Sequence, residues 1–230
     1  FKAASATLTE FAASDRHLGG EAAFTLVLHA WRQDLARHVH VHALVAGGAL
    51  TATGTWVSPK RGFLFPVKAL SRVFRGKFVA ALSTQRATGH WPTVAADTAW
   101  RQLKAALYAH DWVVYAKAPL GGPAQVLEYL ARYTHRVAIS NERIVAIGED
   151  EVAFRVRAQA ATGTKRTVRL HGREFLARFL THVLPTGFKR IRHYGLLARR
   201  RTRAAGWPPP APPSTSPSLH PRSSSRYRHS

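Results

Sequence analysis

The order of apolar and polar residues along the chain predicts alternating strands and helices. Short apolar runs rich in Val, Leu, Thr and aromatic residues occupy residues 22–31 and 112–117, which is typical of buried strands. Residues 38–48 begin with strict alternation of His and Val and then become apolar, so a strand is predicted there as well. Residues 49–59 predict a hairpin, and residues 142–172 predict a meander of strands.

Helical periodicity marks other parts of the chain. In residues 67–85 apolar positions recur every three or four residues, with basic residues on the other side. Four further helices are predicted, over residues 2–14, 98–110, 124–137 and 173–185. Strands and helices interspersed in this order predict an α+β fold, although periodicity alone does not say how the strands pair.

The composition changes abruptly near residue 198. Residues 199–230 are rich in Pro, Ser and Arg and contain no acidic residue, so they lack the apolar surface that a packed core requires. We therefore expect one folded domain over residues 1–198 and a disordered basic tail after it.

The chain is strongly basic, with 34 Lys and Arg against 12 Asp and Glu in 230 residues, a net charge of +22. The tail carries seven Arg, so +15 remains on residues 1–198. Such a charge opposes compaction unless an anionic partner neutralises it, which favours nucleic acid or an anionic membrane. No apolar run approaches the roughly 18–20 residues of a membrane span. We therefore expect a nucleic-acid partner and no membrane.

The residue inventory limits the chemistry that a site could use. The chain has no Cys, which excludes disulfides and thiolate zinc sites and leaves His, carboxylate, amide and Tyr side chains. It also has no Met and begins with Phe1. We therefore expect it to be a piece of a longer protein.

His38, His40 and His42 occupy alternate positions of one predicted strand, so they share a face with about 6.5–7 Å between neighbours. Two imidazoles at this spacing can converge on one divalent cation while Val41 packs on the other face. A solvated strand face, or pairing of the imidazoles with a phosphate, would give the same pattern.

Tyr129 and Tyr133 lie four residues apart in the helix predicted over 124–137, so their hydroxyls share one face. Arg132 and Arg136 make the surroundings basic and suited to a phosphate. A neutral tyrosine is a weak nucleophile, and a cation on the target phosphate offsets this weakness. Taken alone, the pair fits an apolar stripe facing the core better than a reactive site. Together with the histidines, the two tyrosines complete one mechanism.

These motifs, in this order, resemble the HUH-type two-tyrosine rolling-circle transposases of bacterial insertion sequences, the insertion sequence 91 group. The matching segments are HVHVHALVAGG, GFLFPVKALSRVFRGKF, DWVVYAKAPLGGPAQVLEYLARYTHRVAISN and GFKRIRHYGLL. The resemblance extends from about residue 1 to 198. It implies an antiparallel sheet that carries the histidine strand, helices packed on that sheet and a tyrosine helix facing a metal. It also implies a bacterial, cytoplasmic protein.

The resemblance further implies that His40 and His42 bind Mg²⁺ or Mn²⁺. Tyr129 and Tyr133 would be the nucleophiles that attack a DNA phosphodiester and form a 5′-phosphotyrosine. The implied function is the cleavage and rejoining of single DNA strands in rolling-circle transposition. Two departures from the family are Val39, where a proline is usual, and the absence of the Cys-rich zinc module with which members usually begin.

A third metal ligand is expected in an enzyme of this class. Gln33 lies seven residues before His40, where some related replication initiators carry a carboxylate. Its neighbour Asp34 and the same-face His38 are alternatives. We favour Gln33.

Basic side chains are expected to contact DNA phosphates. The candidates are Arg72, Arg75, Lys77, Arg132, Arg136, Lys189, Arg190 and Arg192. Two other functions stay open: a catalytically inactive DNA-binding remnant of such a transposase, and a basic RNA-binding structural protein. The second of these explains the charge but not the histidine and tyrosine motifs.

Overall fold

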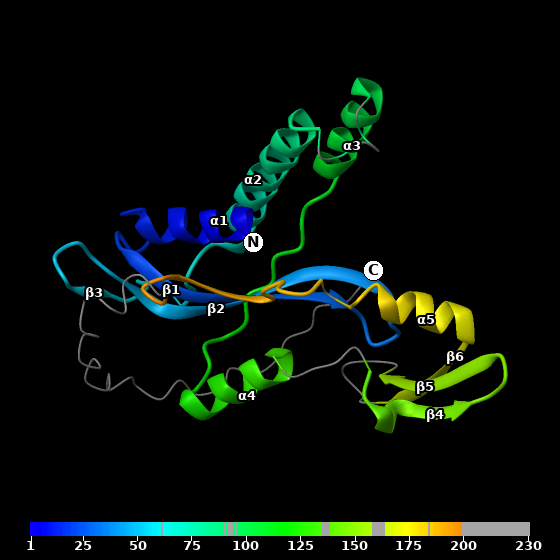
Figure 1. The fold of residues 1–230 in the computed structure, drawn as a ribbon. Helices are drawn as coiled ribbons and strands as arrows, with labels where there is room; N and C mark the ends of the chain where they lie inside the picture. Colours follow the sequence, from blue (N-terminus) through cyan, green and yellow to red (C-terminus); the bar gives the residue numbers. More distant parts are fainter. Residues whose placement is uncertain are drawn as a thin grey trace.

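The structure is a computed structural model. It describes residues 1–60, 62–89, 91, 94, 96–134, 139–157, 164–183 and 185–198, and for residues 132–134 the backbone alone. Within these residues the chain forms two antiparallel sheets and five α-helices, so the predicted α+β fold is confirmed (Figure 1). The predicted disordered tail lies outside the described residues.

The larger sheet has four antiparallel strands in the order β3-β2-β1-β7. They are β1 (Glu21–Trp31), β2 (Arg37–Leu50), β3 (Trp56–Val57) and β7 (Ile191–Gly195). The strands predicted at 22–31 and 38–48 are therefore confirmed, together with the hairpin that follows them. Strand β7 was not predicted, because it lies in the basic segment near the end of the domain.

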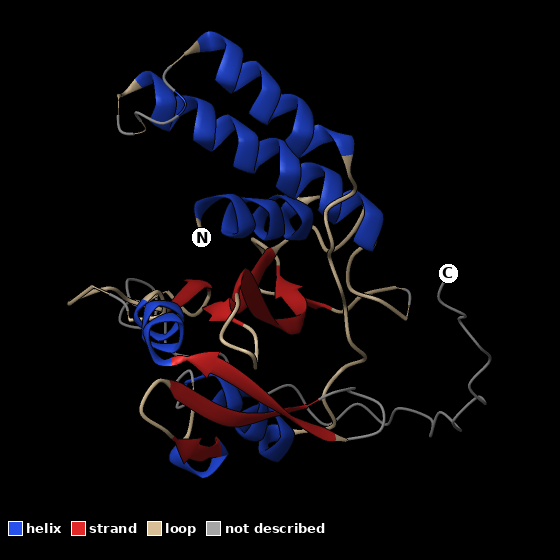
Figure 2. Cartoon of the chain, turned by 90° about the vertical axis from the view of Figure 1, so that its right-hand side faces the viewer, coloured by secondary structure: helices blue, strands red, loops and turns tan. Residues whose placement is uncertain are grey.

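Three helices lie on one side of this sheet: α1 (Lys2–Ala13), α2 (Val67–Ala87) and α3 (Asp97–Ala109). Phe24 and Leu26 of β1 are 0% exposed and belong to the same core cluster as Phe11 of α1 and Leu70 of α2. Helix α3 folds back along α2, and the pair extends away from the sheet (Figure 2). The core of the larger sheet therefore lies between β1 and the first two helices.

Helix α4 (Pro123–Thr134) lies on the opposite side of the sheet, and an extended segment connects it to α3 (Figure 1). The strand predicted at 112–117 is wrong, because residues 111–120 join no sheet. Trp112 instead packs against Phe74 and Phe78 of α2. The apolar residues of this segment are thus used for packing on a helix and not for strand pairing.

The smaller sheet has the order β4-β5-β6. It comprises β4 (Ile144–Ile147), β5 (Glu151–Arg157) and β6 (Lys165–His171), with a 3₁₀ turn at Asn141–Arg143 and helix α5 (Gly172–Leu180). The predicted meander and final helix are confirmed, although the helix ends at Leu180 and not at residue 185. No helix among the described residues is long and apolar enough to cross a bilayer.

The two sheets meet at the turn that joins β1 to β2. Leu35 in this turn is 0% exposed and packs with Trp31, Phe154 and Val156 in a second core cluster. The buried His182 ring lies against the same turn, with its Nε2 2.9 Å from the carbonyl oxygen of Leu35. The smaller sheet therefore holds the end of the β1–β2 hairpin in place.

Candidate metal centre and its tyrosine

Three histidines gather on the face of the larger sheet opposite the apolar core. His29 of β1 is the direct cross-strand partner of His40 in β2, and His42 follows two residues later on the same face. One nitrogen from each of the three side chains lies within 4.8 Å of the others. We call these three residues the histidine trio.

The spacing within the trio suits ligands of one cation. Nδ1 of His29 and Nε2 of His40 are 3.2 Å apart. Two ligands at right angles, each about 2.1 Å from a metal ion, are about 3 Å from each other. All three side chains are half-buried, so the strands hold them without enclosing them completely.

The short turn between β1 and β2 and the register shift next to it together bring the trio into line. The amide of Arg32 donates to the carbonyl of Ala36 at 3.0 Å, and the carboxylate of Asp34 accepts from the Ala36 amide at 3.1 Å. Leu35 has a φ of 60°, a conformation unusual for a residue with a side chain. Burial of Leu35 in the second core cluster stabilises this conformation. The turn pairs Trp31 with Arg37, and a one-residue register shift between Trp31 and His29 then places His29 opposite His40.

His38 orients one member of the trio through its backbone. Nδ1 of His40 lies 2.9 Å from the carbonyl oxygen of His38. A carbonyl oxygen only accepts, so Nδ1 carries the proton and the lone pair on Nε2 faces His29. Metal-binding histidines commonly have their tautomer fixed in this way. The His38 carbonyl thus supports the trio, whereas its ring is exposed.

Tyr129 of α4 reaches this face of the sheet. Its hydroxyl lies 3.3 Å from Nδ1 of His42. Burial, the nearby His40 and the ammonium group of Lys117 lower the pKa of His42 from 6.5 to about 4. His42 is therefore neutral at pH 7, the form in which an imidazole binds metal. The structure thus brings the predicted His40, His42 and Tyr129 together.

Gln33, the favoured third ligand, lies in the turn and not within a strand. Its Oε1 accepts from the backbone amide of Arg157 at 2.8 Å, and its carbonyl oxygen accepts from the Arg143 guanidinium. His29 occupies the place next to His40. Sequence reasoning missed His29 because it stands alone in an apolar strand. The turn length gives no such signal, because a register shift between Trp31 and His29 is needed to put His29 opposite His40.

Several predicted site residues lie outside the described part of the chain. Arg136 is outside it altogether, and only the backbone is described for Arg132 and Tyr133. Position 133 falls within α4, one helical turn after Tyr129.

Residues 23–204 match the protein family described as "Putative transposase". The chain belongs to this transposase family. It is 44% identical over 207 residues to "Putative transposase y4qJ" of Sinorhizobium fredii (strain NBRC 101917 / NGR234), covering 87% of this chain and 52% of that protein. It is 24% identical over 181 residues to "Transposase for insertion sequence element IS801" of Pseudomonas savastanoi pv. phaseolicola, covering 75% and 42%. The resemblance to transposases is thus confirmed.

The chain spans about half the length of these curated relatives. No solved structure matches it.

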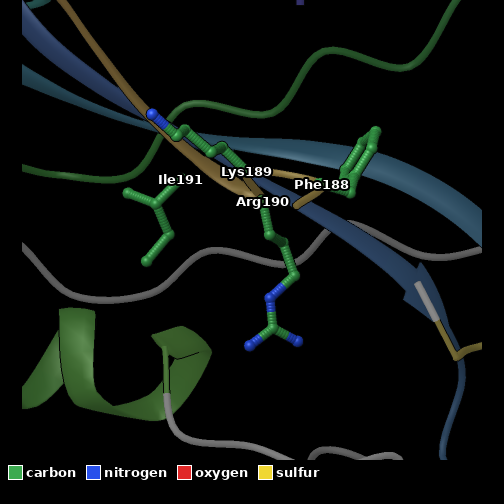
Figure 3. Close-up of a pocket in the computed structure, with 4 residues that line it drawn as sticks. All are labelled: Phe188, Lys189, Arg190 and Ile191. Carbon is green, nitrogen blue, oxygen red and sulfur yellow. The ribbon is translucent and has the colours of Figure 1, made fainter. Parts of the chain in front are cut away.

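Among the predicted DNA contacts whose side chains the structure describes, Arg190 has contacts that lead to the trio. Arg190 places its guanidinium 5.9 Å from the ring centre of Trp31, and that ring lies 4.3 Å from the ring of His29. Figure 3 shows Arg190 and Lys189 pointing to opposite sides just before β7, where both line a hollow with Ile191. Arg190 is therefore connected to His29 of the trio through the ring of Trp31.

The remaining predicted contacts have other neighbours. Lys77 forms a 2.7 Å ion pair with Glu10 of α1. Arg75 donates to the carbonyl of His110 at 2.8 Å and so joins α2 to the end of α3. Arg192 lies over the Phe1 ring at 4.5 Å. The exposed residues among the candidates are Arg72, Lys189 and Arg192.

Proposed function

We propose that this transposase domain cleaves and rejoins single DNA strands by metal-assisted tyrosine transesterification during rolling-circle transposition. The observation that carries the proposal is the 3.3 Å approach of the Tyr129 hydroxyl to His42, a member of the histidine trio. A hydroxyl that could act as nucleophile is thus adjacent to a cluster that could hold a metal ion, which is the arrangement that attack on a phosphodiester requires.

In the proposed reaction the phenolic oxygen of Tyr129 forms a bond to the phosphorus of a DNA phosphodiester. The bond from that phosphorus to the 3′ oxygen breaks, which leaves a 5′-phosphotyrosine and a free 3′ hydroxyl. The proton that the phenol loses balances the proton that the 3′ oxygen gains. The phosphodiester energy is kept in the tyrosine linkage, so rejoining is the reverse attack and needs no ATP.

Tyr133 would act as a second nucleophile. It is one helical turn from Tyr129 in α4, and residues at this spacing share one helix face. One tyrosine could then hold the first strand while the other attacks a second strand.

The three imidazole nitrogens of the trio favour one of the two predicted metal ions over the other. When bound, a divalent cation would withdraw negative charge from the scissile phosphate and stabilise the transition state. Of the two predicted ions, Mn²⁺ suits three imidazole nitrogens better than Mg²⁺, which prefers oxygen ligands. We therefore propose Mn²⁺ at His29, His40 and His42, with His29 in the place for which Gln33 was favoured.

The proposed partner is single-stranded DNA at the ends of the element and at its target, inside the bacterial cell. The charge of +22 supports a polyanionic partner. Binding should weaken steeply between about 50 and 200 mM salt, because Lys and Arg release counterions from the phosphates. A flat salt dependence would argue against nucleic acid.

A covalent-adduct assay tests the proposal. The protein is incubated with Mn²⁺ and labelled single-stranded DNA that carries an element end, and a denaturing gel then separates protein-linked DNA. We expect an adduct with the unmodified chain, none in EDTA, and none with the Tyr129→Phe/Tyr133→Phe double variant. Tyr108→Phe, on the surface of α3, is the matched control and should keep the adduct.

An adduct that persists in the double variant would contradict the two-tyrosine mechanism. If the unmodified chain forms no adduct but binds DNA with a steep salt dependence, the DNA-binding remnant is the better description.

A further inference from the structure

The extended segment between α3 and α4 presents its side chains alternately inward and outward. Trp112 packs against α2, and Val114 packs against the core cluster of the larger sheet. Between and after them, Val113 is 95% exposed and Tyr115 is 79% exposed. Apolar and aromatic side chains with this exposure, on an extended backbone, do not contribute to the folded core.

The backbone that carries these outward side chains is firmly held at its start. The hydroxyl of Ser71 in α2 donates to the carbonyl of Trp112 at 2.6 Å. The indole N–H of Trp112 donates to the carbonyl of Leu107 in α3 at 2.9 Å. Tyr115 is therefore presented to solvent from an anchored segment, which lowers the entropy cost of binding something flat against its ring.

The extended segment continues from Tyr115 toward the candidate metal centre. Lys117 is exposed, as is Ala116 before it, and lies two residues after Tyr115, about 6.5–7 Å further along an extended backbone. The segment that carries Lys117 runs on to helix α4, whose Tyr129 hydroxyl lies 3.3 Å from Nδ1 of His42. Lys117 makes no ion pair with an acidic residue in the described part of the chain, so its charge is available to an external anion.

We propose that residues 113–117 form a track for single-stranded DNA, on which Tyr115 stacks against a base and Lys117 contacts a phosphate next to the metal centre. This inference rests on the proposed function, because it takes DNA as the substrate. Aromatic rings stack on any unpaired base, whereas bases within a duplex are covered by their neighbours. The track therefore favours a single strand over a duplex and tolerates any sequence.

The test measures binding by the whole chain, without catalysis. Fluorescence anisotropy in EDTA gives the Kd for a labelled single strand and for the corresponding duplex. We expect Tyr115→Ala to weaken single-strand binding at least about fivefold, the usual minimum for loss of one stacked base. Tyr115→Phe keeps the ring and should bind normally. Tyr108→Ala removes another exposed tyrosine, from α3, and should also bind normally.

Two further readouts separate stacking and charge from a structural role. A single strand containing 2-aminopurine should lose fluorescence on binding to the unmodified chain and to Tyr115→Phe, but not to Tyr115→Ala. Lys117→Ala should reduce the slope of log K against log salt by about 0.7, the value for one phosphate contact on a single strand. Lys117→Arg should restore that slope.

The proposal is overturned if Tyr115→Ala binds single strands as tightly as the unmodified chain. It is equally overturned if Tyr115→Phe loses as much affinity as Tyr115→Ala, or if Tyr108→Ala does so. Thermal melts by circular dichroism show whether each variant is folded. A missing covalent adduct would defeat the proposed function while leaving these binding results intact, so the two failures are distinguishable.

Discussion

The two faces of the β1–β2 hairpin use neighbouring residues for different purposes. Phe24 and Leu26 point to the helix-covered face and are completely buried. His29 and His40 point to the opposite face, are half-buried, and stand beside a helix that brings a tyrosine. Because strand side chains alternate, one pair of strands supports both a core and the candidate site. Folding stability and chemistry should therefore respond separately to substitution.

The largest expected effect on stability is on the covered face. Phe24→Ala should lower the free energy of unfolding by about 3–5 kcal/mol, because it leaves a cavity among fully buried residues. His29→Ala, on the open face, should change it by no more than about 1 kcal/mol. Urea denaturation of both variants measures the difference. Equal destabilisation by the two substitutions would show that the faces are not separable.

Metal affinity should show the reverse order. We expect His29→Ala, His40→Ala and His42→Ala each to weaken Mn²⁺ binding by more than about 100-fold, beyond the 10–100-fold typical of losing an outer partner. Isothermal titration calorimetry gives the affinities. His38→Ala is the matched control, since it keeps the carbonyl that orients His40.

The same titrations compare the two candidates for the third ligand. Loss of binding in Gln33→Ala with normal binding in His29→Ala would restore Gln33 as that ligand. Loss in His38→Ala with normal binding in His40→Ala would show that the pair chosen on β2 is wrong.

The smallest expected effect is a pH dependence of stability in metal-free protein. The pKa of His42 is about 4 in the folded chain against an ordinary 6.5. As the pH falls from 6.5 toward 4, the unfolded chain takes up a proton that the folded chain does not, so stability decreases. Above pH 6.5 this group contributes no slope. Solvent screening at a half-exposed site keeps the effect small.

Urea denaturation in EDTA at several pH values measures this slope. His42→Asn should remove part of it. An unchanged slope in that variant would show that His42 keeps an ordinary pKa in the folded chain.

The local sequence pattern was a good guide to β2 and a poor guide to residues 112–117. Both segments have the composition of a strand, but only residues 37–50 find partners, on β1 and β3. In the other segment Trp112 packs against two aromatic rings of α2. Strand pairing depends on which backbone lies alongside, and that is a property of the tertiary structure that local periodicity does not contain.

The candidate site could be predicted where its residues are close in sequence. His40 and His42 share a face because of strand geometry, and Tyr129 follows from the helix pattern and the family resemblance. His29 belongs to the trio through cross-strand register, which includes a shift between Trp31 and His29 that no local sequence pattern marks. Arg190 reaches the same face from a part of the chain whose strand, β7, was not predicted.

The central claim is that Tyr129 attacks DNA beside the histidine trio. The most direct measurement uses Tyr133→Phe protein, digests its DNA adduct with nuclease and locates the remaining nucleotide by tandem mass spectrometry. The account predicts a nucleotide on Tyr129, formed with Mn²⁺ and absent when His29 and His40 are both replaced by Ala. A nucleotide on a residue outside α4, or an undiminished adduct in the His29→Ala/His40→Ala variant, would contradict it.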